Sequence, residues 1–116
     1  LPNVWIDSAA LTIQVKLARD GSNIVAPKAQ QFRADYRHPG KVLRALATAF
    51  PGRMVWGSDT PAYSYICRRR QGGDTIQEFR LKAVYEDEVA ALRYLPENLQ
   101  REVANRNTLN FLFGRE

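Results

Sequence analysis

Residues 53–61 read Arg53-Met54-Val55-Trp56-Gly57-Ser58-Asp59-Thr60-Pro61, and this stretch decides the fold class. Its short apolar run is followed by glycine, serine and proline, which is typical of a buried strand that ends in a loop. A second such run, Val4-Trp5-Ile6, has Asp7 and Ser8 as its polar exit. Because continuous apolar runs occur where both faces of a parallel sheet are covered, these stretches predict two adjacent parallel strands.

The segment that follows the first strand has two possible structures. Residues 9–19 carry Leu11, Val15 and Ala18 at helical spacing, whereas Thr12-Ile13-Gln14-Val15 alternates as a strand does. We favour the helix. Residues 20–23 are a turn signal, and a weakly patterned helix is expected to start near Pro27.

An amphipathic helix is predicted directly before the second strand. Pro51 and Gly52 end it. Its apolar stripe consists of Val42, Leu43, Leu46, Ala47 and Phe50. The order strand, helix, strand indicates an α/β fold.

The second half of the chain is expected to be mainly helical. A loop of about 15 residues is expected after Asp59, and it contains Cys67 and the basic run Arg68-Arg69-Arg70. Further helices are predicted from Thr75, from Pro96 and over residues 107–113, where Gly114 ends the last one. The stripe assigned to the helix from Thr75 is Ile76, Phe79, Ala83, Glu86, Ala90 and Tyr94.

Composition limits the classes of protein to consider. The 116 residues suit a single unit, 1–116, and the one cysteine and one histidine exclude an internal disulfide and a multi-histidine metal site built from this chain alone. No apolar run is long enough for a membrane span and no signal peptide is recognisable, so we expect a cytoplasmic protein with no membrane partner. Because the chain begins with Leu1 and its only methionine is Met54, we expect a piece of a longer protein; tag removal is the alternative.

Charge is spread unevenly. The net charge is +5; residues 1–58 hold eight basic and three acidic side chains, whereas residues 59–116 hold nine of each. The run Arg68-Arg69-Arg70 could contact phosphates, but no aromatic interleaving or binding motif surrounds it. We therefore interpret it as a solvated loop, and nucleic acid is not the expected partner.

Three stretches together resemble the C-terminal portion of the amidohydrolase-related family, the metal-dependent TIM-barrel hydrolases and nonoxidative decarboxylases. Residues 3–8 resemble the penultimate barrel strand, of the form N-V-Y-x-D-x-S, and residues 53–61 resemble the final strand with its G-S-D-x-P ending. Residues 95–114, with Asn107-Thr108 before the last apolar residues, resemble the closing helix. The order and spacing of the three stretches carry the resemblance.

The resemblance implies a partial TIM (β/α)8 barrel, with the last two strands and the closing helices. It also implies that Asp59 is catalytic and a metal ligand, since the family's matching aspartate binds a divalent metal or takes a proton from the metal-bound water. Zinc is the metal that the resemblance favours. The alternative is that Asp59 is a turn residue. Asp7 and Ser8 are interpreted as a polar strand end, Asn107 as structural, and His38 as a helix-start residue rather than a ligand.

The family's metal site also needs a His-x-His pair and further histidines, which this chain lacks. We therefore expect the chain alone to be inactive and to bind no metal. A small-molecule substrate is expected only when the missing part of the barrel is present. Two short strands cannot close a barrel, so a missing N-terminal segment or a second copy is expected to cover them. The alternative function is a non-catalytic oligomerising or binding module derived from the same fold.

Overall fold

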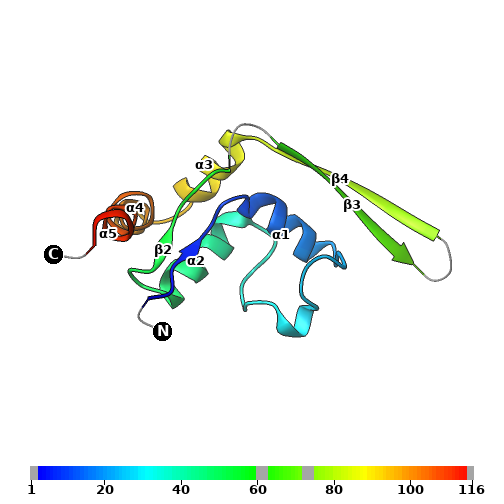
Figure 1. Ribbon diagram of the computed structural model, residues 1–116, viewed down its shortest axis with the longest axis horizontal. Coiled ribbons are helices and arrows are strands. Elements are labelled where there is room, and N and C mark those ends of the chain that lie inside the picture. Colours follow the sequence, from blue (N-terminus) through cyan, green and yellow to red (C-terminus); the bar gives the residue numbers. More distant parts are fainter. Residues whose placement is uncertain (1–2, 60–62, 72–74, 115–116) are drawn as a thin grey trace.

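The chain forms a mixed α/β structure that is mostly helical and contains two short parallel strands (Figure 1). The computed structural model describes residues 3–59, 63–71 and 75–114, with the backbone alone over 63–71, 75–79 and 81. Its elements are β1 (Ile6–Asp7), α1 (Leu11–Arg19), the 3-10 turn η1 (Lys28–Gln30), α2 (Pro39–Ala49), β2 (Met54–Val55), β3 (Tyr63–Gln71), β4 (Thr75–Ala83), α3 (Tyr85–Arg93), α4 (Glu97–Arg101), the π-helical turn η2 (Glu102–Arg106) and α5 (Asn107–Phe113).

The two apolar runs at the start and middle of the chain pair in parallel, as predicted. Ile6 lies opposite Met54 and Asp7 opposite Val55. The amide of Ile6 donates to the Arg53 carbonyl at 2.9 Å, and the amide of Ser8 donates to the Val55 carbonyl at 3.1 Å. Each strand has only two residues, so the ladder is shorter than the apolar runs that predicted it.

The C-terminal helices close the outer edge of β2. The Trp56 amide donates to the Val103 carbonyl at 2.9 Å, and Asn107 Nδ2 donates to the Met54 carbonyl at 2.7 Å. The π-helical turn makes the first bond possible, because the Asn107 amide bonds five residues back to Glu102 rather than four back to Val103. Asn107 is therefore structural, as expected from its place at the start of the last helix.

Helix α1 is buried on two opposite sides, which explains its ambiguous sequence pattern. Leu11 and Val15 belong to the main core, which also contains residues of α2, β2 and the C-terminal segment. Ile13 and Leu17 belong to a second cluster that includes Ala83 at the end of β4. Each side of the helix buries two residues that are four positions apart, and the two pairs are offset by two positions. Every second residue from Leu11 to Leu17 is therefore apolar and buried, which is also the alternation of a strand.

The prediction of a loop to residue 74 followed by a helix from Thr75 is wrong. Residues 63–71 and 75–83 form an antiparallel pair in which Tyr63 lies opposite Ala83 and Gln71 opposite Thr75. This hairpin projects away from the helical body (Figure 1). The helical stripe assigned to residues 76–94 was an accidental match, because the first half of that segment is extended.

The helix that follows the hairpin also has a different buried face from the predicted one. Helix α3 begins at Tyr85 and buries Glu88 and Ala91, and Leu95 follows them in the main core. The predicted face included Ala90 and Tyr94, which are exposed. The error arose because a helical phase was carried through residues that form β4.

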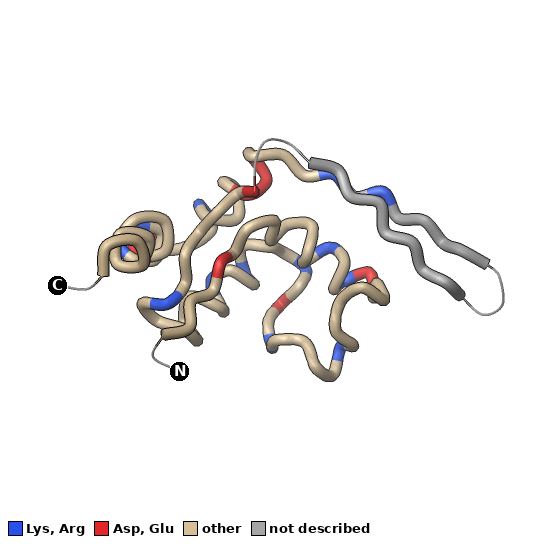
Figure 2. The backbone as a smooth tube through the Cα atoms, viewed as in Figure 1, with Lys and Arg blue, Asp and Glu red and all other residues tan. Residues whose placement is uncertain are grey.

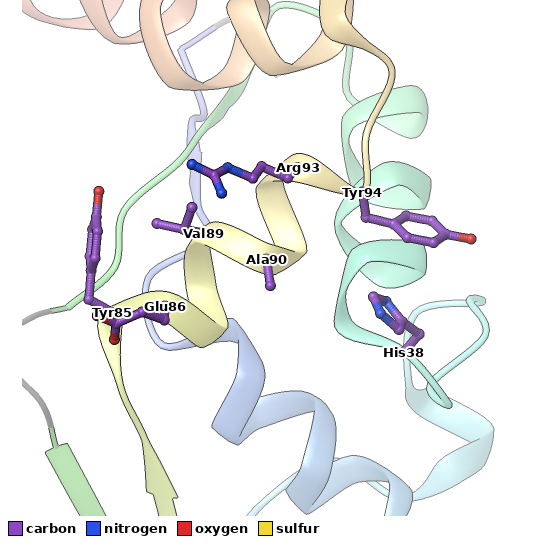
Figure 3. A pocket seen from close by; sticks show the side chains of 7 residues that line it. All are labelled: His38, Tyr85, Glu86, Val89, Ala90, Arg93 and Tyr94. Carbon is purple, nitrogen blue, oxygen red and sulfur yellow. The ribbon is translucent and has the colours of Figure 1, made fainter.

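Helices α2 and α3 approach closely at Gly40. A Cβ atom added to Gly40 would overlap the Tyr94 side chain, so only glycine fits there. His38 begins α2, and its Nδ1 atom accepts a hydrogen bond from the Gly40 amide at 3.0 Å. Figure 3 shows the His38 and Tyr94 side chains side by side at this junction, with ring centroids 4.7 Å apart. The helix-start role predicted for His38 is confirmed.

Candidate functional site

The carboxyl ends of β1 and β2 meet at one edge of the small sheet. Asp7 ends β1, and its Oδ1 atom accepts a hydrogen bond from the Ala9 amide at 2.9 Å. The same oxygen lies 3.1 Å from the position that a Cβ atom on Gly57 would occupy, so the backbone after β2 passes close to the Asp7 carboxylate. In parallel α/β folds this edge carries the chemistry, because the loops after the strands converge there.

Strained backbone occurs at this same edge. Among the described residues, only two residues other than glycine have a positive φ angle: Ala10 and Asp59, each at 57°. Ala10 follows β1 and Asp59 follows β2. Such conformations cost on the order of 1 kcal/mol or more and gather at functional sites. The strain therefore marks the loops after both parallel strands.

Asp59, the predicted catalytic residue and metal ligand, lies four residues beyond the end of β2. Its side chain is exposed, and residues 60–62, which include Thr60 and Pro61 of the quoted motif, lie outside the described residues. An exposed carboxylate can bind a hard divalent cation or accept a proton. The role of Asp59 stays a prediction.

Two buried polar side chains, Glu88 and Ser8, lie near the start of α1, and sequence reasoning missed the first of them. Glu88 of α3 is only 1% exposed, and its Oε1 atom accepts a hydrogen bond from the Thr12 amide in the first turn of α1 at 3.0 Å. Ser8 is 3% exposed, its carbonyl accepts from the Leu11 amide, and its hydroxyl has no hydrogen-bond partner among the described residues. Glu88 thus caps α1 from a distant helix. The signal available in the sequence was the helical spacing of Glu88 with Ala91 and Leu95, which places Glu88 on the same buried face as these two apolar residues.

The described residues do not make a metal site by themselves. No group of three or more His, Cys, Asp or Glu side chains comes together in the described part of the chain. Asp7 supplies a carboxylate at the strand edge, and Asp59 supplies an exposed one four residues beyond β2. The Nδ1 atom of His38 is engaged at the start of α2. A zinc site of the expected kind needs nitrogen ligands that these residues do not provide. Cys67 and the basic run fall in β3, where the backbone alone is described.

A surface pocket of about 530 Å³ lies along α3 (Figure 3). At one end, the Tyr85 ring contacts the Trp56 ring, with centroids 6.3 Å apart, and Trp56 directly follows β2. The pocket therefore begins beside the strand edge rather than within it. Its lining residues are His38, Tyr85, Glu86, Val89, Ala90, Arg93 and Tyr94.

Within the described ranges, no helix has the length and apolar character needed to cross a bilayer. Comparison with known proteins gives no match: none of the family models, curated proteins or solved structures matches this chain.

Proposed function

We propose that this chain is the C-terminal part of a metal-dependent hydrolase or decarboxylase similar to the amidohydrolase-related enzymes, and that it is inactive alone. The observation that supports the proposal most strongly is the parallel pairing of β1 with β2, with Asp59 in a strained conformation just beyond the carboxyl end of β2. The proposal treats these elements as the last two strands of a TIM barrel. Asp59 is then at the end of the barrel where catalytic groups lie.

Asp59 has one of two roles in the proposed enzyme. As a ligand, its carboxylate holds the divalent metal; as a base, it accepts a proton from the reacting water. A bound metal would supply a water molecule whose pKa is lowered to roughly 7. The histidine ligands would come from strands outside this chain, because its only histidine, His38, caps α2.

The two outer edges of the sheet differ in what they can accept. No other strand of the described residues pairs with the outer edge of β1, so a preceding barrel strand can be added there. The outer edge of β2 already holds the Trp56–Val103 and Asn107–Met54 hydrogen bonds. Closing a full barrel therefore requires the Trp56 amide to exchange Val103 for a neighbouring strand.

This closed edge favours a second candidate, a non-catalytic module that oligomerises. Such a module needs an apolar surface, and α5 with the residues around it provides one. Its exposed apolar side chains are Val4, Leu109, Phe111, Leu112 and Phe113. In this candidate, the helices and not additional strands would form the contact between copies.

Metal content distinguishes the two candidates. The protein is expressed from its complete reading frame, and its bound divalent metals are measured by mass spectrometry for the wild type, Asp59→Asn and Asp20→Asn. Asp20 is a matched control, because it pairs with Arg19 at the end of α1. The enzyme proposal predicts an upstream His-x-His segment, about one metal per chain, and a loss of metal in Asp59→Asn alone.

Two results would overturn the enzyme proposal: a reading frame without any His-x-His segment, or a metal content that Asp59→Asn and Asp20→Asn leave equally unchanged. Light scattering of the 116-residue chain tests the second candidate. A stable dimer or larger assembly that Phe113→Ser dissociates would support it, and a monomer at all concentrations would exclude it.

A further inference from the structure

Residues 28–44 carry a clear excess of positive charge. Residues 28–44 carry five basic side chains and a single acidic one, Asp35. Figure 2 shows this segment as the loop before α2 and the first half of α2, with basic positions on both. This segment is far in sequence from the arginine run at 68–70 and lies outside the strand edge that contains Asp59.

A groove of about 530 Å³ runs along the outer face of α2 within this segment. Lys41, Arg44 and Thr48 lie on one helical face because they are three and four residues apart. Phe32 and Arg33 come from the preceding loop, and Tyr94 comes from the end of α3. From Lys41 to Ala49 the helix rises about 12 Å, which is long enough for a ligand with two chemical parts.

The charges in the groove are of one sign. Three of its lining residues are cationic and none is acidic. Asp35, beside the groove, binds Lys41 Nζ at 2.7 Å and so offsets part of its charge. Within the described residues, Arg33 and Arg44 have no ion-pair partner. Two guanidinium groups therefore remain available to an anion, and guanidinium binds carboxylate or phosphate through paired hydrogen bonds.

The loop side of the groove is held in place before any ligand arrives. The Phe32 ring packs against the Phe50 ring at 6.0 Å, and the Tyr36 hydroxyl donates to the Phe32 carbonyl at 2.9 Å. Burial raises the pKa of Tyr36, so this hydroxyl keeps its proton. A preformed site loses less entropy when a ligand binds.

Aromatic rings flank the cations. Phe32 lines the groove on the loop side and Tyr94 lines it beside α3. The Tyr94 ring is held by its contact with His38. Flat aromatic ligands stack on such rings, and combined with nearby cations this arrangement selects ligands that are both aromatic and anionic.

We propose that this groove binds a small molecule that joins an anionic group to an aromatic ring, with Arg33 and Arg44 holding the anion and Phe32 or Tyr94 stacking on the ring. The proposal is independent of the proposed enzyme function, because it uses no residue of the strand edge. The site would serve recognition or regulation by the ligand.

Adenosine 5′-monophosphate is a suitable probe, because it has both chemical parts. Amide chemical shifts are followed by NMR during titration with this nucleotide, with adenosine and with inorganic phosphate. We expect saturable shifts that centre on residues 32–33 and 41–48, and a dissociation constant at least about tenfold lower for the nucleotide than for either part alone.

Three variants test the assigned contacts. Arg44→Gln should weaken nucleotide binding about tenfold, and Phe32→Leu should weaken binding of the nucleotide but not of phosphate. Arg106→Gln, which changes the charge equally at an exposed position in η2, should leave both unchanged. The amide spectrum of each variant also shows whether it is folded.

The proposal is overturned if the shifts are non-saturable or spread over the whole surface. It is also overturned if Arg44→Gln and Arg106→Gln have equal effects, or if phosphate alone binds as tightly as the nucleotide. Failure of this site leaves the metal experiment at Asp59 unaffected, so the two proposals can be judged separately.

Discussion

Replacing Asn107 with aspartate tests how the C-terminal segment holds the sheet. Asn107 is 1% exposed, and its Nδ2 atom donates to the carbonyl of the fully buried Met54. Asn107→Asp keeps the size of the side chain but replaces the donor with an acceptor. An ionised carboxylate would then face a carbonyl oxygen at a separation near the original 2.7 Å.

The loss of stability in Asn107→Asp is limited by the free energy needed to protonate the new carboxyl group. A protonated carboxyl group can donate to the Met54 carbonyl and restore the bond. Keeping it protonated at pH 7 costs at most about 4 kcal/mol, since its ordinary pKa is about 3.9 and each pH unit is worth about 1.4 kcal/mol. The loss of the hydrogen bond sets a lower limit of about 1 to 3 kcal/mol.

The destabilisation should depend on pH in a defined direction. A carboxyl group whose pKa is raised by folding destabilises the protein above its unfolded pKa. The penalty therefore grows as the pH rises from about 4 and shrinks in acid. We expect Asn107→Asp to lower the free energy of unfolding by about 2 to 4 kcal/mol at pH 7 and by less than about 1 kcal/mol at pH 4.

Urea unfolding followed by tryptophan fluorescence measures this directly, because Trp56 adjoins β2 and Trp5 adjoins β1. Asn105→Asp is the matched control: it makes the same chemical change at an exposed position of η2 and should alter stability by no more than about 0.5 kcal/mol. If the two variants were equally stable at pH 7, the Asn107–Met54 bond would not hold the sheet as described.

Two further predictions concern the helical body. Gly40→Ala should lower the melting temperature measured by calorimetry. Overpacking against Tyr94 costs about 1 to 3 kcal/mol, which exceeds the gain of up to about 1 kcal/mol in helix propensity. A higher melting temperature would contradict the close approach of α2 and α3. Hydrogen bonds from Arg37 and Lys41 hold the pKa of Asp35 well below its usual range, so the stability it confers is fully present above about pH 4 and is lost in stronger acid. Asp35→Asn should therefore melt below the wild type at pH 7, and thermal melts should show this difference diminishing as the pH falls to about 2; a difference that stays constant with pH would show that the ion pairs are not its cause.

Helix α2 and the pair β1–β2 could be predicted from the sequence, because nearby residues specify each of these elements, whereas only a 3-10 turn forms where a helix was expected near Pro27. Pro39 and Gly52 bracket α2, and its apolar stripe has a single phase. The residues of α1 follow two patterns at once, since Leu11 and Ile13 enter different clusters on opposite sides of the helix. A helix satisfies both patterns, because its second side packs in a cluster with Ala83, a residue distant in sequence.

The hairpin and the buried face of α3 could not be predicted by extending one period along the chain. The segment from Thr75 to Ala83 pairs with β3, and this pairing overrides the helical spacing of Ile76, Phe79 and Ala83. The sequence did contain a hairpin signal, because Gly72-Gly73 lies between two segments that each carry three β-branched or aromatic residues: Tyr63, Tyr65 and Ile66 before it, and Thr75, Ile76 and Phe79 after it.

The candidate site was predictable only where it lies next to a strand. Asp59 and Asp7 follow apolar runs, so their position at the strand ends could be derived. Glu88 is separated from Thr12 by 76 residues, and only the packing of α3 against α1 makes its carboxylate a cap. The groove on α2 has the same origin, since Phe32 and Tyr94 meet through the fold and not through spacing.

The adjacent parallel strands β1 and β2 bring the loops that contain Asp7 and Asp59 to one edge of the sheet. NMR couplings across hydrogen bonds would detect this pairing residue by residue. The structure predicts couplings from the Ile6 amide to the Arg53 carbonyl and from the Ser8 amide to the Val55 carbonyl. Rapid exchange of both amides without such couplings, or couplings in an antiparallel register, would contradict it.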